Sequence, residues 1–419
     1  MGQWFSTDAN TESANLASSV NQYLKNFKLE SRILSEETRV LIQYFLEKGD
    51  VPKAISIVNS VFKVIENAPL SIAVTGESGA GKSTLINALR GMGHEEEGSA
   101  ATGAVETTME RTEYKHPKFP NVSIWDLPGI GTTNFPPEKY LREVKFAEYD
   151  FFLLVSAARF KYSDAELAKA IAKMKKNFYF VRTKIDMDLA SEEKAKPTTF
   201  RKDVILGKMS DDCVKNLQGA QVTASEIFLV SSLDRSDYDF PKLETTLLRD
   251  LPAHKRHIFM QCLPSVTEAA IDRKRDALKQ MMFLDALKRG ATATIPFTGH
   301  VTDKDIEKLE EILTQYRSDF GLDDASLENV AKDLHVSVQD LKANLQSPRL
   351  LSADSHESLV ENLKEGMEAI SSVTGEFIAA GLYFTMVFYL QYYFLDTVAS
   401  DAKALLNKED LFHASGSYD

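Results

Sequence analysis

The segment that most constrains this chain is the glycine-rich octapeptide Gly-Glu-Ser-Gly-Ala-Gly-Lys-Ser at residues 76–83. It fits the pattern G-x-x-x-x-G-K-[ST], a loop whose backbone N–H groups and following helix N-terminus hold phosphates. The run 70–75 before it is apolar and typical of a buried strand, and the run 84–90 after it is typical of a helix. Strand, glycine loop and helix together predict an α/β P-loop fold that binds a nucleoside triphosphate.

Each residue type in this loop has its own predicted role. Gly76 and Gly81 allow the tight backbone path, Lys82 reaches the β- and γ-phosphates, and the Ser83 hydroxyl can ligate Mg²⁺. The residues predicted to bind phosphate are Gly76, Glu77, Gly79, Ala80, Gly81, Lys82, Ser83, Thr84 and, from a later motif, Gly129.

That later motif is Asp126-Leu-Pro-Gly129, which follows the apolar run 122–125. An Asp at the tip of a strand beside a phosphate loop can hold Mg²⁺ through water, and the amide of Gly129 can sense the γ-phosphate. At this distance behind a phosphate loop, the motif predicts the second half of a magnesium site, with Ser83 as the first half.

The segment between the two motifs contains small residues and several threonines, which suit a loop that orders around the γ-phosphate. One of Thr102, Thr107 or Thr108 is expected to complete the Mg²⁺ coordination, with Thr102 and Thr108 the preferred candidates. The sequence does not choose between them.

A third motif, Thr183-Lys-Ile-Asp186, resembles the [NT]-K-x-D element with which GTPases bind guanine. The Asp186 carboxylate would accept hydrogen bonds from the guanine N1–H and exocyclic amine, a pair that adenine does not offer. The stem of Lys184 would cover the base. Thr183 stands where Asn is usual. Ser231 and Ser232, after the strand-like run 227–230, are expected at the position that offers a backbone amide to the guanine O6.

The residue after Gly129 bears on hydrolysis. Ras-like enzymes place a water-orienting Gln there, whereas this chain has Ile130. An aliphatic side chain cannot position water, so help must come from elsewhere. The first candidate is Glu106 and the second is Glu77; the alternative is that Glu106 is an ordinary solvated charge. The predicted catalytic residues are Lys82 and Glu106.

Taken together, these motifs resemble the interferon-inducible immunity-related GTPases. The matching segments are residues 76–83, Thr102-Gly-x-x-Glu106, residues 125–131, residues 132–137 and residues 183–186. Lys82 matches the branch with Gly-Lys-Ser in the loop, and the resemblance extends over essentially the whole chain.

The resemblance implies a Mg²⁺-dependent GTPase that assembles through its nucleotide domains and coats or disrupts vacuoles that hold pathogens. It implies that Glu106 acts in hydrolysis promoted by dimerisation. It also implies a dimer contact that includes Arg159, Lys161 and Asp164, and regulation by related GTPases of the family. The alternative function is a monomeric switch or scaffold that recruits effectors, with hydrolysis only as a reset.

Composition narrows the class of protein further. The chain has 419 residues, of which 43% are hydrophobic and 26% charged, as in an ordinary globular protein. Its formal net charge of −12 argues against nucleic-acid binding, which normally needs a basic surface. Two cysteines, Cys213 and Cys262, do not form a disulfide framework and suit a reducing cytosol.

The motifs alternate with helical patterns in the βαβ manner between residues 68 and 252, while the flanks are helical. We therefore expect an N-terminal helical segment at 1–67, a Ras-like GTPase domain with a mostly parallel sheet at 68–252, and a C-terminal helical part at 253–419. The two helical parts are expected to pack together as one all-α domain.

Two features point to a membrane. Residues 1–6 fit M-G-x-x-x-[ST], which predicts N-myristoylation of Gly2 and peripheral attachment of a cytosolic protein. One acyl chain anchors only marginally, so a second signal is needed. The uncharged stretch Phe377–Leu395 has the length of a membrane helix, but its polar residues favour a buried helix of the helical domain. Membrane insertion is the alternative.

Overall fold

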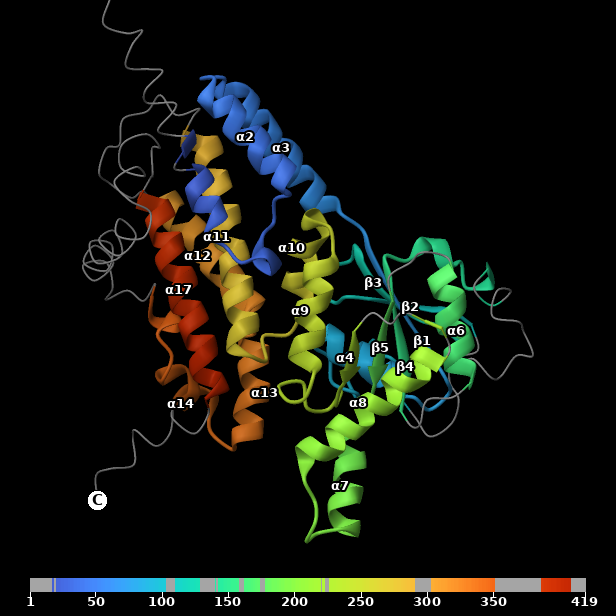
Figure 1. Ribbon diagram of the computed structural model, residues 1–419. Coiled ribbons are helices and arrows are strands. Elements are labelled where there is room, and N and C mark those ends of the chain that lie inside the picture. The colour runs from blue at the N-terminus through green and yellow to red at the C-terminus, as the bar shows by residue number, and fades with distance from the viewer. Residues whose placement is uncertain are drawn as a thin grey trace, which may run out of the picture. The chain divides into compact units, whose positions relative to one another are not determined.

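The computed structural model describes residues 17–18, 20–102, 110–128, 140, 142–157, 162–173, 178–219, 221–222, 226–290, 303–350 and 386–407. The chain divides into two compact units. One unit is Asn67–Asp250, and the other combines Met1–Glu66 with Leu251–Asp419 (Figure 1).

The unit Asn67–Asp250 is built on a six-stranded sheet with the strand order β2-β3-β1-β4-β5-β6. The strands are β1 (Leu70–Gly76), β2 (Thr112–Lys115), β3 (Val122–Asp126), β4 (Phe151–Ser156), β5 (Phe178–Arg182) and β6 (Ile227–Leu229). β2 pairs antiparallel with β3, and all other neighbours are parallel. The predicted mostly parallel P-loop fold is confirmed.

Helices cover both faces of this sheet. The helices in contact with its strands are α4 (Lys82–Arg90), α6 (Tyr162–Lys173), α8 (Lys202–Gly219) and α9 (Phe240–Asp250). α7 (Ile185–Ala195) follows β5 and extends away from the sheet (Figure 1), and the 3₁₀ turn η2 (Phe146–Glu148) precedes β4. Alternate strand residues such as Phe152 and Phe180 form one apolar cluster with Leu167 of α6 and Leu217 of α8. Every residue of β4 and β5 is buried, and both strands are apolar up to their last residues, Ser156 and Arg182.

The strand order sets the position of the site. β1 pairs with β3 on one side and with β4 on the other, so the connections run in opposite directions from β1. In open α/β sheets, ligands bind beside the carboxyl ends of the strands at such a point. Here β1 ends at Gly76 and β3 ends at Asp126, which places both predicted phosphate motifs at this edge.

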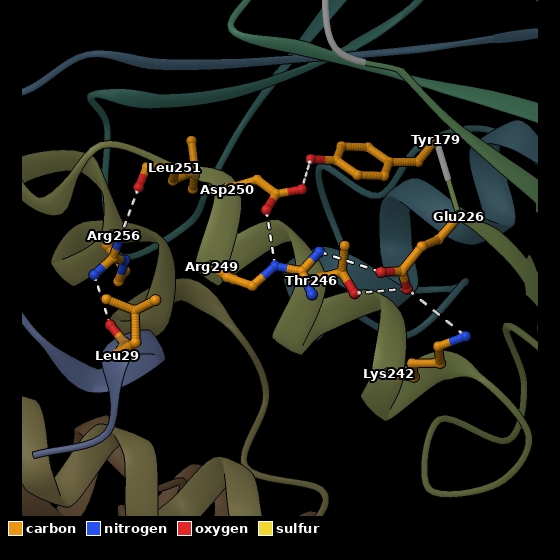
Figure 2. Close-up of polar contacts among 9 residues, drawn as sticks. All are labelled: Leu29, Tyr179, Glu226, Lys242, Thr246, Arg249, Asp250, Leu251 and Arg256. Carbon is orange, nitrogen blue, oxygen red and sulfur yellow. Dashed lines mark hydrogen bonds and ion pairs between the residues drawn. The ribbon is translucent and has the colours of Figure 1, made fainter. Parts of the chain in front are cut away.

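At the opposite end of β5, polar contacts fasten α9 to the sheet (Figure 2). The Tyr179 hydroxyl donates to Asp250 Oδ2 at 2.7 Å, and Arg249 Nε donates to Asp250 Oδ1 at 2.9 Å. Arg249 also reaches Glu226 Oε1 at 3.2 Å. The last turn of the unit is therefore held by charge-assisted hydrogen bonds, which are stronger than neutral ones.

The second unit is helical. Its elements are η1 (Leu29–Ser31), α2 (Glu36–Glu47), α3 (Val51–Asn67), α10 (Ala253–Cys262), α11 (Glu268–Gly290), α12 (Asp303–Asp319), α13 (Asp324–Leu334), α14 (Val338–Ala343), η3 (Ser347–Arg349) and α17 (Met386–Leu406). α17 packs against α11 and α12, and the three run side by side in Figure 1. Phe394 and Leu395 of α17 are fully buried in their shared core.

Segments from both ends of the chain bind each other within this unit. Arg256 of α10 donates to the carbonyl of Leu29 at 2.6 Å and to that of Leu251 at 3.0 Å (Figure 2). Gln280 of α11 donates to the Ser31 carbonyl at 2.8 Å and accepts from the Ile33 amide at 3.3 Å. These buried hydrogen bonds tie the N-terminal segment to α10 and α11.

The stretch Phe377–Leu395 lies partly outside the described residues. Its described part belongs to α17, which continues past Leu395 through Asp396 and Asp401 to Leu406. No helix in the described part of the chain is long and apolar enough to cross a membrane.

Candidate functional site

The phosphate loop follows directly from β1, and its glycines take backbone conformations that other residues rarely adopt. Gly76 has φ +146°, Gly79 +75° and Gly81 +83°. At Gly76 an added Cβ would lie 2.0 Å from the carbonyl oxygen of Val155 on the neighbouring strand. The close approach of β1 and β4 therefore requires glycine at the first position of the motif.

We expect Gly76→Ala to destabilise the protein by about 3 kcal/mol or more, because the clash is with strand backbone that cannot move aside. Thermal unfolding measures the effect. Gly79→Ala is the matched control, since nothing lies within 4 Å of its added Cβ and only its positive φ is strained. Equal losses in the two variants would contradict the steric argument.

Lys82 begins α4 and is 7% exposed. Its ammonium donates to the carbonyls of Gly76 at 3.3 Å and Glu77 at 3.0 Å, so the side chain folds back over the loop. A buried point charge in this position, beside the N-terminus of α4, suits the β- and γ-phosphates of a nucleotide.

The fold brings Ser83, in the first turn of α4, close to Asp126 at the end of β3. The Ser83 hydroxyl donates to Asp126 Oδ2 at 3.0 Å, and Asp126 is fully buried at the end of β3. A hydroxyl and a carboxylate are hard oxygen ligands, and Mg²⁺ bound to nucleotides takes only one or two of them from the protein. The two residues therefore fit the predicted magnesium site.

Tyr140 joins the ends of β1 and β3, and sequence reasoning did not find it. Its buried hydroxyl lies 2.9 Å from Thr75 Oγ1 and donates to the Pro128 carbonyl at 2.9 Å. Burial raises the pKa of Tyr140, so the phenol stays neutral. The hydroxyl thus fixes the spacing between the phosphate loop and the Asp126 motif.

The predicted guanine-binding element is attached to the phosphate loop. Thr183 Oγ1 donates to the Ala80 carbonyl at 2.6 Å, and Lys184 Nζ donates to the Gly79 carbonyl at 2.9 Å. The backbone of Lys184 adopts the left-handed conformation, with φ +60°. The hydroxyl of Thr183 therefore makes a buried tie between the two motifs, which gives the departure from Asn a structural role.

Beside this tie lies a cavity of about 170 Å³. It is lined by Gly81, Thr84, His94, Thr102, Thr183, Lys184, Asp186, Met187, Ser232 and Leu233. Asp186, in the first turn of α7, is half-buried on its wall. Predicted phosphate, magnesium and guanine residues from four distant segments thus meet at one cavity.

The two serines after β6 have different positions. Ser231 is fully buried, and its hydroxyl accepts from the backbone amides of Leu233 at 3.3 Å and Asp234 at 3.2 Å. Ser232 lines the cavity. Ser231 therefore shapes the loop, and Ser232 faces the space that the base would take.

Arg235, three residues further on, was not predicted. Its Nη1 donates to the Ala88 carbonyl near the end of α4 at 3.2 Å, and burial lowers its pKa. A cation at a helix C-terminus is favourable. The loop with Ser232 is thereby fixed to the helix that begins at the phosphate loop.

Several predicted residues lie outside the described part of the chain. They are Gly2, Glu106, Thr107, Thr108, Gly129, Ile130, Arg159 and Lys161. Asp164, predicted in a dimer contact, lies in the first turn of α6 and is 1% exposed. The contact of Asp164 with a second copy stays a prediction.

The comparisons with known proteins agree with these motifs. Residues 35–409 match the family model described as Interferon-inducible GTPase (IIGP). Interferon-gamma-inducible GTPase 10 of Mus musculus is 58% identical over 409 residues, covering 98% of each chain. T-cell-specific guanine nucleotide triphosphate-binding protein 2 of Mus musculus is 58% identical and covers 94% of this chain and 95% of its own.

A more distant relative, Interferon-inducible GTPase 1 of Mus musculus, is 43% identical and covers 97% of this chain and 99% of its own. Among solved structures, Toc33 from Arabidopsis thaliana with Mg²⁺ and GMPPNP matches 48% of this chain at 16% identity, with a TM-score of 0.31. The family match over most of the chain and the full-length relatives establish the assignment: this chain belongs to the interferon-inducible GTPases and is a GTPase that binds and hydrolyses GTP.

Proposed function

We propose that this GTPase is Mg²⁺-dependent and assembles in its GTP state on membranes, where it coats and disrupts vacuoles that contain pathogens. Support for the membrane comes from the pattern Met1-Gly-Gln-Trp-Phe-Ser6, which fits N-myristoylation at Gly2. The protein would then be cytosolic and attach to the membrane peripherally. Partners are further copies of this chain and related GTPases of the family.

The need for assembly follows from two weaknesses of a single molecule. Ile130 cannot orient water, so an isolated subunit would hydrolyse GTP slowly. One myristoyl chain binds membranes with a constant of only about 10⁴ M⁻¹. Assembly would remedy both, since neighbouring subunits add their acyl chains to one surface and bring Glu106 into a shared interface.

Bound Mg²⁺ would neutralise charge that develops on the phosphates. The chain's own residues would hold it through Ser83 and Asp126, while Lys82 binds the β- and γ-phosphates. Thr183 and Lys184 keep the guanine-binding element attached to the phosphate loop.

The proposal predicts that GTP hydrolysis per molecule rises steeply with protein concentration, because each active site would be completed by a neighbour. Steady-state phosphate release from acylated protein, with and without anionic vesicles, measures this. Glu106→Ala should bind GTP normally and lose the rise. Gly2→Ala should keep the rise in solution and lose sedimentation with vesicles.

A specific activity that stays flat across concentrations would contradict assembly and favour the second candidate, a monomeric switch that recruits effectors. Unacylated protein that remains on vesicles in GDP would contradict the acyl anchor. In that case residues 377–395 would be the next candidate for the membrane anchor.

A further inference from the structure

The segment 93–101, here called the arm, connects α4 to Thr102 and is closed by its own hydrogen bonds. The Ser99 hydroxyl donates to the His94 carbonyl at 3.0 Å, and the Gly93 amide donates to Glu96 Oε1 at 2.8 Å. The Ser99 amide also donates to the Glu96 carbonyl at 3.0 Å. These internal hydrogen bonds hold residues 93–99 in one closed loop.

Asn87 on α4 holds this arm. It is fully buried, and its side-chain amide binds both backbone groups of Ala100, as a neighbouring strand would. Nδ2 donates to the Ala100 carbonyl at 3.0 Å, and Oδ1 accepts from the Ala100 amide at 2.6 Å. Nδ2 also lies 3.4 Å from His94 Nδ1. One side chain thus touches both ends of the arm.

Two neighbouring residues support this contact. Arg90 donates to the carbonyl of Gly98 at 2.9 Å and, through Nε and Nη2, to that of Lys115 at 3.2 and 2.9 Å. The Arg90 guanidinium lies over the Tyr114 ring, 5.5 Å from its centroid. Burial raises the pKa of Tyr114, and the backbone amide of Ala101, the residue before Thr102, opposes this shift because its N–H is directed at the hydroxyl oxygen.

Both ends of the arm lead into the nucleotide cavity. His94 and Thr102 line it together with Gly81 and Asp186. Asn87 lies on the same helix, α4, that begins at Lys82 and Ser83. The Asn87 side-chain amide makes its two hydrogen bonds to Ala100 and not to its own helix. It therefore joins α4 to the segment that leads to Thr102 at the cavity.

We propose that Asn87 is a positioning residue that sets the arm so that Thr102 faces the nucleotide when the γ-phosphate is present. The proposal rests on Thr102 supplying the hydroxyl near Mg²⁺, and it is independent of membrane assembly. The phosphate loop and the guanine-binding element would supply most contacts to GDP, whereas the γ-phosphate of GTP would add the contact with Thr102. The contact with Asn87 therefore contributes to GTP binding and hydrolysis and not to GDP binding.

The test measures affinity for a fluorescent non-hydrolysable GTP analogue and for GDP at protein concentrations too low for assembly. Asn87→Ala removes two hydrogen bonds to Ala100, so its Kd for the analogue should rise about tenfold. Its Kd for GDP should stay within about twofold of wild type by the same reasoning. Asn121→Ala is the matched control, because its Nδ2 bonds the Ala68 carbonyl at 3.0 Å. This bond precedes the amino ends of β1 and β3, at the opposite edge of the sheet from Gly76 and Asp126.

A second variant guards against loss of folding at the buried Asn87. Tyr114→Phe deletes one hydroxyl from a partly exposed ring and should raise the Kd for the analogue about threefold, with GDP unchanged. Equal loss of analogue and GDP affinity in both variants would overturn the proposal, since it would mean a general structural role. Unchanged affinity for both nucleotides would also overturn it.

Discussion

Lys82→Ala is expected to raise the Kd for GTP by about a hundredfold or more. Removing one partner of a buried, hydrogen-bonded charge pair costs about 2–5 kcal/mol, and each 1.4 kcal/mol is tenfold in Kd. Lys82 is 7% exposed and has its ammonium over the phosphate loop, where water cannot replace it fully. Fluorescence titration with a labelled GTP analogue measures the change.

The Lys82 side chain also bonds the loop carbonyls of Gly76 and Glu77, so its removal could act on the fold instead of the ligand. Thermal unfolding without nucleotide separates the two effects. Lys115→Ala, at an exposed lysine of β2, is the control for loss of one positive charge. If Lys82→Ala left the GTP affinity unchanged, the ammonium would stabilise the loop conformation and would not bind the phosphates.

The sequence predicts those parts of the fold whose signal is local. The strand-like runs 70–75, 122–125 and 227–230 correspond to β1, β3 and β6, whose residues are mostly buried, and such short apolar runs can be recognised without knowing the partner strand. β2, with the sequence Thr-Glu-Tyr-Lys, was not predicted. It is an exposed, polar edge strand that exists because of its pairing with β3.

The same distinction holds in the helices. α2 ends at Glu47 and α3 begins at Val51, so the helices separate next to Gly49, and Pro52 lies in the first turn of α3, where proline fits. α14 begins after Ser337, whose hydroxyl accepts from the Asp340 amide at 3.0 Å. Caps and breakers act within a few residues, so a single sequence carries them.

The site was predictable where it follows a spaced motif and not where it depends on distant contacts. Gly76–Ser83, Asp126 and Asp186 are recognised from short patterns. Tyr140 and Asn87 carry no pattern, because their roles come from backbone groups to which only the folded chain brings them. A polar Asn inside the apolar run 84–89 was the one signal, and it gives no hint of its partner.

Asp186→Asn is expected to exchange guanine for xanthine preference. The carboxylate would accept two hydrogen bonds from guanine, and losing a charge-assisted pair should weaken GTP binding about 10²- to 10⁴-fold. The Asn amide can instead donate to the additional carbonyl of xanthine. Asp186 is half-buried on the wall of the nucleotide cavity, so water would compensate only partly.

Competition between labelled GTP and unlabelled GTP, XTP, ITP or ATP measures this exchange. Asp188→Asn is the matched control: it lies two residues further along α7 and its carboxylate is bound to Arg182 at 2.8 Å. That variant should retain guanine preference. If the Asp186→Asn variant lost affinity for GTP without gaining affinity for XTP, the Asp186 carboxylate would stabilise the loop and would not bind the base. Comparable binding of ATP and GTP by the wild-type protein would remove the assigned role of Asp186 altogether.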